Sequence, residues 1–503
     1  MSSTLSRRAL LRGAAGLLGT LSAGSLLSAC VSSQPAAKPA ESKPAESKPA
    51  EAAKPAESKP AAPAAQPAAT TAPAAPAAAA KPTEAAKPAA QTAPATKKLS
   101  GTLRLHVRTG PEEDTLKDML PKFKDDIGVD VKLETFPTEE YATKIQTLMA
   151  GGTIGDVMWG IQRTTPRYAR NKQILQLDDL IAKDKYDMGL YWPGAVEACK
   201  YMGGIWAVPY KIHPGPAAVY YNVQQMKEAG VTMPEKQYAS WDELKKNAKA
   251  ATKDGRFGLQ LNITAGGATN TPQPVTMFLR SWGTDLYSED GKKSMLNEPK
   301  AKEAIRFMWD LMHTDKVAVT GKEFPASSSE ELMIAQKVSQ LMAASSTKSI
   351  ITKTGGKFDV KNVIAPPGPA GIVGTQAIVD HINISAKTQN PEAAWELAKF
   401  MTSTEFGVRL GGGTGGTASG TTGAQIAVFN DPRIMANPLH PIFIDLVKMA
   451  TAPRFPANLR EEEHAQALHQ TMMPIWLGER KPDDAFFDEL TKACQAVLDQ
   501  PIV

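Results

Sequence analysis

A low-complexity stretch divides the chain into two very different parts. Residues 31–98 repeat variants of Pro-Ala-Glu-Ser-Lys-Pro and contain almost no large apolar side chains. Burial cannot offset the entropy of ordering such a segment, and its frequent prolines favour a disordered but extended chain. At ~3.1 Å per residue it reaches roughly 200 Å at most. We expect a tether here, either a spacer for a binding module or a stalk without a specific role, and a folded body in residues 99–503.

The net charge of +5 belongs to the N-terminal part of the chain. Residues 1–98 carry 12 basic and 5 acidic side chains, whereas residues 99–503 carry 45 basic and 47 acidic ones. A body that is nearly neutral lacks the basic surface on which DNA and RNA binding depends. Nucleic acid is therefore not expected as a partner.

The first thirty residues resemble an export signal. The pair Arg7-Arg8 precedes a weakly apolar stretch, 13–27, and the sequence Leu-Ser-Ala then leads to Cys30. This order is similar to a twin-arginine signal, residues 1–29, that ends in a bacterial lipobox, whose cysteine becomes lipidated. We expect a lipoprotein held on the extracytoplasmic side of the membrane through Cys30. A leftover N-terminal helix with a chance cysteine is the alternative.

Two further cysteines lie in the body, Cys199 and Cys494. Export permits a disulfide, but two cysteines almost 300 positions apart do not require one. A body of about 400 residues can also build its core without a covalent link. The pairing is left open by the sequence.

From residue 99 onward, strand and helix patterns alternate. The periodicity predicts strands at 102–107, 128–134 and 156–159, and helices at 113–124 and 141–150. Ser240 with Glu243 predicts a capped helix start, and Asn390 before Pro391 predicts another. Strands that recur between helices predict an α/β fold with a mainly parallel sheet covered on both faces. A body of about 400 residues is too large for one such core, so two lobes are expected.

The sequence contains no convincing catalytic or cofactor pattern. Its seven histidines are scattered, and the spacing of His464 and His469 does not suit two metal ligands on one helical face. The glycine-rich stretch 411–416 formally contains G-x-G-x-x-G, but it follows a helical pattern rather than a strand, which contradicts a dinucleotide site. We expect a flexible loop there, no cofactor and no metal.

Six segments, taken in order, resemble a known family. They are F-x-x-x-x-G-V-x-V at 123–131, a helix with a Gly-Gly turn at 141–152, Asp-Val at 156–157, Leu-Gln-Leu-Asp-Asp-Leu at 175–180, the run from Gly-Gly-Ile-Trp to Ser-Trp-Asp-Glu-Leu at 203–244, and Asn-Pro-Glu-Ala-Ala-Trp at 390–395, extended to Phe400. Together they are similar to bacterial extracellular solute-binding proteins of family 1, the sugar-type receptors of ABC importers. The chain departs from the family pattern at 321–350 and 411–423.

The resemblance implies a periplasmic-binding-protein-like (type II) clamshell of two α/β lobes with the ligand in the cleft between them. Lobe 1 would comprise 99–211 plus 383–446, and lobe 2 would comprise 212–382 plus 447–503. A ligand that touches both lobes would stabilise the closed form, which docks on the permease subunits of the importer. A monomer without cofactor or catalysis is expected.

The candidate ligand-binding residues follow from position and chemistry. Trp159 ends a strand where the cleft would open, and its ring would stack on a sugar; a core role is the alternative. Candidates that flank the expected crossings between the lobes, or the first strand, are Arg108, Tyr210, His213, Asp380, His381, Asn458 and Arg460. Hinge packing, surface solvation or structural hydrogen bonds are the alternatives for these, whereas Trp206 and Trp309 are expected in the core.

The ligand class follows from the same resemblance, which implies a carbohydrate. A polyol, a glycerophosphate-like compound and a polyamine stay open as alternatives. Two other protein classes also stay open, namely a surface enzyme acting on polysaccharide and a structural adhesin.

Overall fold

The computed structural model describes residues 98–253, 255–263, 271–324, 327–412 and 421–503. The predicted signal, the lipidation site Cys30, nearly all of the tether and most of the glycine-rich stretch 411–416 lie outside the described residues. Within the described part, the strands form a six-stranded sheet, a three-stranded sheet and a two-stranded hairpin.

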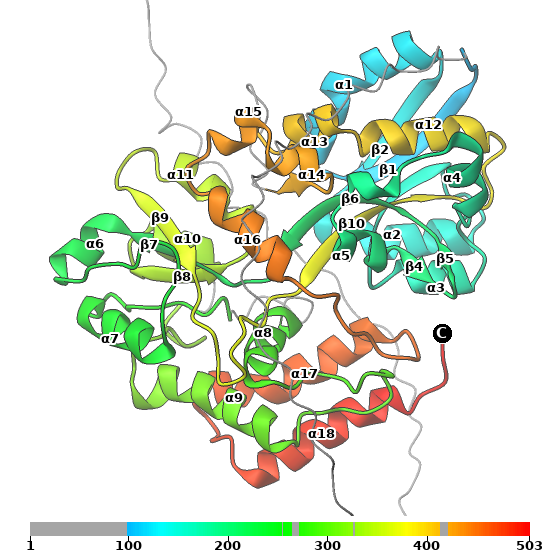
Figure 1. Ribbon diagram of the computed structural model, residues 1–503. Coiled ribbons are helices and arrows are strands. Elements are labelled where there is room, and N and C mark those ends of the chain that lie inside the picture. The colour runs from blue at the N-terminus through cyan, green and yellow to red at the C-terminus, as the bar shows by residue number, and fades with distance from the viewer. Residues whose placement is uncertain (1–97, 254, 264–270, 325–326, 413–420) are drawn as a thin grey trace, which may run out of the picture. The chain divides into compact units, whose positions relative to one another are not determined.

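The six-stranded sheet has the strand order β11-β6-β10-β3-β1-β2. Its strands are β1 (Thr102–Arg108), β2 (Asp130–Phe136), β3 (Val157–Ile161), β6 (Val208–Pro214), β10 (Ala377–Ile384) and β11 (Thr422–Gly423), and the hairpin consists of β4 (Lys200–Tyr201) and β5 (Gly204–Ile205). Helices α1 (Pro111–Ile127) and α12 (Pro391–Met401) lie along one face of the sheet, and α2 (Thr138–Ala150) and α3 (Thr165–Arg170) lie along the other (Figure 1).

The prediction of a mainly parallel sheet was wrong. Only β1 pairs in parallel, with β2 and with β3, whereas β10 runs antiparallel to both of its neighbours and β11 runs antiparallel to β6. The physical reason is the route of the chain: it leaves the sheet after β6 and, on its return, enters as β10 between β3 and β6. Local strand and helix patterns carry no information about the direction of such a returning strand.

The predicted local elements formed, but with shifted ends: β3 continues to Ile161, so Trp159 lies inside the strand and not at its end as predicted. Leu103, Leu105 and Val107 alternate along β1 and are buried, which matches the expected strand. The expected helix starts also form: the Ser240 side chain accepts from the backbone N–H of Glu243 at 3.1 Å, and the Asn390 side chain accepts from Ala393 at 3.3 Å. These caps satisfy amide donors that the first helical turn leaves free.

The three-stranded sheet has the order β8-β7-β9 and is antiparallel. It comprises β7 (Ala218–Asn222), β8 (Gln340–Ala343) and β9 (Val360–Ile364). The helices that follow these strands along the chain or lie near them in Figure 1 are α6 (Val223–Glu228), α7 (Trp241–Ala251), α8 (Pro272–Trp282), α9 (Pro299–Trp309), α10 (Ser329–Ile334), α11 (Ile350–Lys353), α17 (Glu461–Trp476) and α18 (Asp484–Leu498). The remaining helices are α4 (Asp178–Asp184), α5 (Pro193–Ala198), α13 (Thr404–Leu410), α14 (Ile426–Phe429), α15 (Pro432–Met435) and α16 (Pro441–Met449).

Extended segments connect the two sheets and are hydrogen-bonded to one another. The N–H of Ala377 donates to the carbonyl of Thr451 at 2.9 Å, and the N–H of Gly215 donates to the carbonyl of Gln376 at 2.8 Å. Backbone bonds of this kind hold the connections side by side. The exact residue limits of the lobes stay a prediction.

The two cysteines of the body do not pair, because Cys199 and Cys494 are both buried free thiols. Within the described part of the chain, no helix combines the length and the apolar character that crossing a membrane requires.

Gly258 offers a test of the packing around α7. A Cβ atom at this position would lie 1.8 Å from the carbonyl oxygen of Ala248, which is helix backbone and cannot rotate away. We expect Gly258→Ala to lower the free energy of unfolding by about 1–3 kcal/mol, as overpacking does, measured by urea denaturation. Gly194→Ala is the matched control, because its Cβ would meet no atom closer than 3.5 Å. Equal stability of the two variants would contradict the packing described.

Candidate ligand-binding site

Four charged side chains meet at one end of the six-stranded sheet. Arg108 ends β1, Glu112 lies in the first turn of α1, Lys211 is in β6 and Asp380 is in β10. Lys211 Nζ lies 2.8 Å from Asp380 Oδ2, Arg108 Nη2 lies 3.5 Å from the same oxygen, and both cations also contact Glu112. We call this set the charge quartet; each carboxylate meets both cations, so the set is neutral overall.

Glu112, Lys211 and Asp380 are buried and Arg108 is partly buried, which makes this neutrality necessary. The side chains of Lys211 and Asp380 are only 4% and 9% exposed, and an unpaired ion at such depth would be strongly destabilising. Burial alone would raise the pKa of Asp380, but Lys211 and Arg108 more than offset it, so the pKa lies well below its usual range. The same balance lowers the pKa of Glu112. Both carboxylates are therefore ionised at neutral pH.

Trp159 lies against this cluster, and two neighbours fix its ring. The guanidinium carbon of Arg108 is 3.9 Å from the centroid of the Trp159 ring. The ring of Tyr141 packs edge-on against Trp159 at 4.9 Å, and its hydroxyl lies 2.9 Å from the carbonyl oxygens of His106 and Trp159. A cation on one side and an aromatic edge on another hold the indole in a single orientation.

Several buried polar atoms around the charge quartet have no hydrogen-bond partner among the described residues. They are Trp159 Nε1, Tyr210 OH and His213 Nδ1. Two further buried atoms, Arg163 Nε and Ser345 Oγ from the segment that follows β8, also lack a partner among the described residues. Burial lowers the pKa of His213 to about 4, against the opposing pull of Asp380, so its imidazole is neutral at pH 7. Because buried polar groups are normally paired, these donors and acceptors suit a ligand rich in hydroxyl groups.

Five of the predicted site residues are thus brought together: Trp159, Arg108, Tyr210, His213 and Asp380. Tyr210 and His213 belong to the same strand as Lys211, and the charges of Asp380 and Arg108 act on the pKa values of both side chains. Their roles in binding stay predictions.

The other three predicted residues have structural partners elsewhere. His381 Nδ1 lies 2.9 Å from Thr165 Oγ1, at the start of α3. Asn458 Nδ2 donates to the carbonyls of Val497 and Leu498, at 2.7 and 3.1 Å, and Arg460 Nε donates to that of Pro501 at 2.9 Å. Asn458 and Arg460 thus tie the C-terminal segment to the start of α17, and none of their described contacts reaches the charge quartet.

Sequence reasoning missed Glu112 and Lys211. Lys211 had a usable signal, because it is a charged residue inside the apolar strand pattern around Val208 and Ile212, like Asp380 in its own strand. Glu112 had none beyond its place in the first turn of a helix, where acidic residues are common for electrostatic reasons. Its partner Lys211 lies 99 positions away in the chain.

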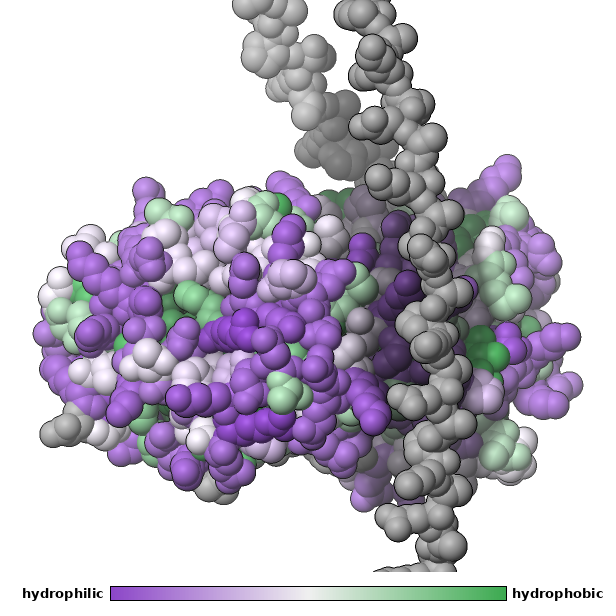
Figure 2. Space-filling view, turned by 90° about the horizontal axis from the view of Figure 1, so that it is seen from below, coloured by the Kyte–Doolittle hydropathy of each residue, from purple (hydrophilic) through white to green (hydrophobic). Residues whose placement is uncertain are grey.

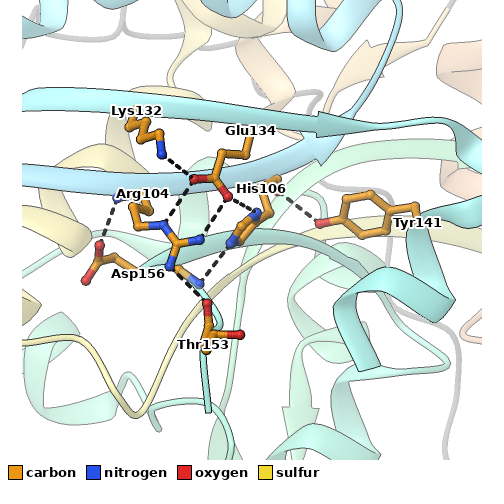
Figure 3. A network of polar contacts seen from close by, with 8 residues as sticks. Arg104, His106, Lys132, Glu134, Tyr141, Thr153 and Asp156 are labelled. Carbon is orange, nitrogen blue, oxygen red and sulfur yellow. Dashed lines mark hydrogen bonds and ion pairs between the residues drawn. The ribbon is translucent and has the colours of Figure 1, made fainter. Parts of the chain in front are cut away.

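A second polar network stabilises β1 next to the charge quartet (Figure 3). Arg104 donates through Nε and Nη2 to the two oxygens of Glu134, at 3.1 and 2.9 Å, and this bond is the main reason why the pKa of Glu134 falls to about 2. His106 Nε2 accepts from the N–H of Gly155 at 2.9 Å, so its proton resides on Nδ1, 3.5 Å from Glu134. The network holds β1 against β2 and β3 and thereby fixes Arg108.

One face of the molecule is largely polar. Figure 2 shows hydrophilic residues over most of the visible face, and a hollow beside the grey trace. A separate cavity of about 800 Å³ lies beside the connecting segments, lined by residues that include Arg280, Asp285, Thr375 and Arg454. It shares no residue with the charge quartet.

Among the described residues, no group of three or more His, Cys, Asp or Glu side chains is arranged to hold a metal ion.

Comparison with known proteins decides the family. The family model for bacterial extracellular solute-binding proteins matches residues 109–407. The chain belongs to this family. The resemblance found in the sequence is confirmed, and the protein is the extracytoplasmic substrate-binding component of an ABC importer.

Individual relatives of this solute-binding protein are distant. A binding protein of Brucella abortus (strain 2308) is 24% identical over 397 residues, covering 77% of this chain and 90% of the relative. The erythritol/L-threitol-binding protein of Mycolicibacterium smegmatis is 22% identical over 336 residues, covering 61% of this chain and 68% of its own. The GacH receptor of Streptomyces glaucescens, solved unliganded and with acarbose, has a TM-score of 0.67 at 22% identity and covers 80% of this chain and 100% of its own. The predicted two-lobe fold is confirmed by this match.

The charge quartet of this solute-binding protein can be tested by removing one cation. Lys211→Met keeps the apolar stem but leaves two buried carboxylates facing Arg108 alone. We expect a loss of about 3–5 kcal/mol in the free energy of unfolding, because breaking a buried pair leaves an uncompensated charge. The measurement is chemical denaturation at pH 7.

The control is Lys117→Met, which removes a lysine from an exposed pair with Glu113 on α1. Such surface pairs contribute little, so its denaturation midpoint should stay close to that of the wild type. A Lys211→Met protein as stable as this control would show that the quartet is not needed for folding.

Proposed function

We propose that this protein captures a neutral, polyhydroxylated solute, a carbohydrate or a polyol, and delivers it unchanged to the importer's permease. The observation that carries this proposal is the neutral charge quartet beneath Trp159, surrounded by buried polar atoms that have no partner among the described residues. Arg108, Trp159, Tyr210, His213 and Asp380 are the proposed ligand-binding residues.

The charge balance argues against charged ligands. A phosphate or carboxylate group would need a cation with unused charge, but Arg108 and Lys211 are both engaged by Glu112 and Asp380. A polyamine would need a free carboxylate, but both carboxylates of the quartet are already paired with its two cations. A neutral hydroxyl can accept from one member of the quartet and donate to another without separating the ions.

The aromatic surface supports a sugar or polyol. Such molecules present C–H faces that pack on aromatic rings, and hydroxyl groups that need paired donors and acceptors. Trp159 offers a ring held in place by Arg108 and Tyr141, with an unpartnered Nε1 at its edge. The names of relatives point the same way: one binds erythritol and L-threitol, and a structural neighbour was solved with acarbose.

The proposed mechanism is a shift in population between open and closed lobes. A ligand can favour the closed form only through contacts that the open form lacks. Binding residues in the six-stranded sheet, together with Ser345 beside the three-stranded sheet, would supply contacts from both sides. The closed form would then dock on the permease, so that transport depends on a bound solute.

We also propose how the protein is placed in the cell envelope. The order of Arg7-Arg8, the apolar stretch and Cys30 supports export by the twin-arginine route and lipid anchoring through Cys30. The proline-rich segment 31–98 would let a monomeric body range from the membrane surface to the permease.

A thermal-shift screen of the purified protein against mono- and oligosaccharides, polyols, sugar phosphates and polyamines tests the ligand class. A ligand that binds only the native state raises the melting temperature, and the shift grows with the logarithm of the ligand concentration above Kd. We expect neutral saccharides or polyols to give the largest shifts. A larger shift with phosphates or polyamines, or recovery of a cleaved saccharide, would contradict the proposal.

The role of Trp159 is tested on the ligand found by that screen. Trp159→Ala should weaken binding by roughly 1–3 kcal/mol, because the stacking face is lost, measured by isothermal titration calorimetry. Trp309→Ala, a tryptophan on α9, is the matched control and should bind as the wild type does. If both variants bind normally, Trp159 is a core residue rather than a ligand contact.

A further inference from the structure

A buried lysine outside the charge quartet has no carboxylate partner. Lys348 lies in η4 (Ser345–Ser349), a 3-10 helix that follows β8, and only 2% of the residue is exposed. Its Nζ is 3.0 Å from Thr422 Oγ1 and 2.8 Å from His440 Nδ1. Among the described residues it forms no ion pair, although buried ammonium groups normally require one.

The hydrogen-bond partners of Lys348 are both uncharged. His440 Nε2 lies 2.9 Å from the carbonyl oxygen of Phe429 and donates to it, so Nδ1 carries the lone pair that accepts from Lys348. The other close group is the Phe443 ring, 5.5 Å away. Neither a hydroxyl nor a neutral imidazole compensates a full positive charge. Burial accordingly lowers the pKa of Lys348 to about 7, and burial together with Lys348 lowers the pKa of His440 to about 3.

The contact joins segments that belong to the two sheets. Lys348 follows β8 of the three-stranded sheet, whereas Thr422 is in β11 of the six-stranded sheet. The η4 segment packs against β6, the strand that carries Lys211 and His213 of the proposed site. The same η4 segment carries Ser345, whose buried Oγ has no partner among the described residues. Lys348 therefore holds a wall of the proposed site in place.

We propose that Lys348 is a positioning residue whose neutral amine favours the docking of η4 against the six-stranded sheet, so that ligand affinity rises with pH above neutrality. This inference rests on the proposed function for its effect on affinity, but not for the state of the amine. No redox or covalent step is involved; the proton is exchanged with water when η4 undocks.

Apart from His440, no other titratable group on the packed elements has a described contact with Lys348. On β6, Lys211 contacts Asp380 and Glu112, and the charges of Asp380 and Lys211 act on the pKa of His213. On α16, Asp445 pairs with Lys236 at 2.8 Å. On β7, Tyr220 donates to the carbonyl of Ala344 at 2.9 Å. Among the described titratable residues, His440 is the one that contacts Lys348, and its imidazole stays neutral above pH 4. Lys348 is thus the group whose protonation changes near pH 7.

The direction of the effect follows from the two pKa values. In undocked or unfolded chains the lysine titrates near 10.5, whereas in the docked arrangement it titrates near 7. Between these values the undocked state binds more protons, so raising the pH favours the docked state. Below about pH 7 both states are protonated, and the dependence disappears.

The test compares pH profiles of ligand affinity between pH 6 and 9, using calorimetry and the saccharide or polyol that gives the largest thermal shift. We expect wild-type affinity to rise several-fold across this range. Lys348→Met, which keeps the apolar stem without a charge, should flatten the profile and bind at pH 6 at least as well as the wild type. Lys361→Met, an exposed lysine on β9, should keep the wild-type profile.

The inference is overturned if Lys348→Met shows the wild-type slope. Lys348→Arg, which cannot lose its charge, should bind more weakly at every pH; wild-type affinity in this variant would also overturn it. If Lys348 had only a structural role, Lys348→Met would instead lower the ligand affinity equally at all pH values.

A ligand-free measurement separates this inference from the proposed function. In wild-type protein with 13C-labelled lysine ε-carbons, one resonance absent from Lys348→Met should titrate near pH 7. Titration of that resonance near the ordinary lysine value would overturn the inference, even if sugars bind. Titration near pH 7 would support the inference that the buried Lys348 amine loses its proton near neutrality, even if no sugar or polyol binds.

Discussion

Neutralisation of buried charge is the constraint on which the site and much of the larger sheet depend. Arg108, Glu112, Lys211 and Asp380 come from β1, α1, β6 and β10, and each needs the others because an unpaired ion at this depth is costly. The pairs form only if β10 lies between β3 and β6, with Asp380 in register with Lys211. The same four side chains therefore help to specify the strand order and determine the electrostatics of the binding surface.

This double role shapes what the site can recognise. Since the ionic interactions are satisfied within the protein, discrimination among solutes in the proposed site would fall to the ring of Trp159 and to neutral groups such as Tyr210 OH and His213 Nδ1. Neutral hydrogen bonds are individually modest, but a missing one leaves a buried group unpaired, which is expensive. A site of this kind can distinguish hydroxyl patterns while keeping a charge balance that folding also requires.

The sequence was informative where the signal was local, and uninformative where it depended on distant chain segments. The alternation in β1 and the caps at Ser240 and Asn390 predicted elements that formed, and polar Asp380 within an apolar strand predicted a special environment. The antiparallel entry of β10 could not be read from any local pattern. The placement of Asn458 could not be predicted either, because its hydrogen-bond partners are backbone carbonyls about forty positions away.

Two buried lysines show how environment divides one residue type into two roles. Lys211 faces two carboxylates, whereas Lys348 faces a hydroxyl and a neutral imidazole. A lysine between carboxylates can keep its charge as a permanent part of the framework, and one without them is most stable after losing its proton. In the proposed site the charge balance would thereby be fixed, whereas the docking of η4 would respond to pH. Separation of the two allows the strength of binding to vary with pH without altering the charge balance that excludes ionic solutes.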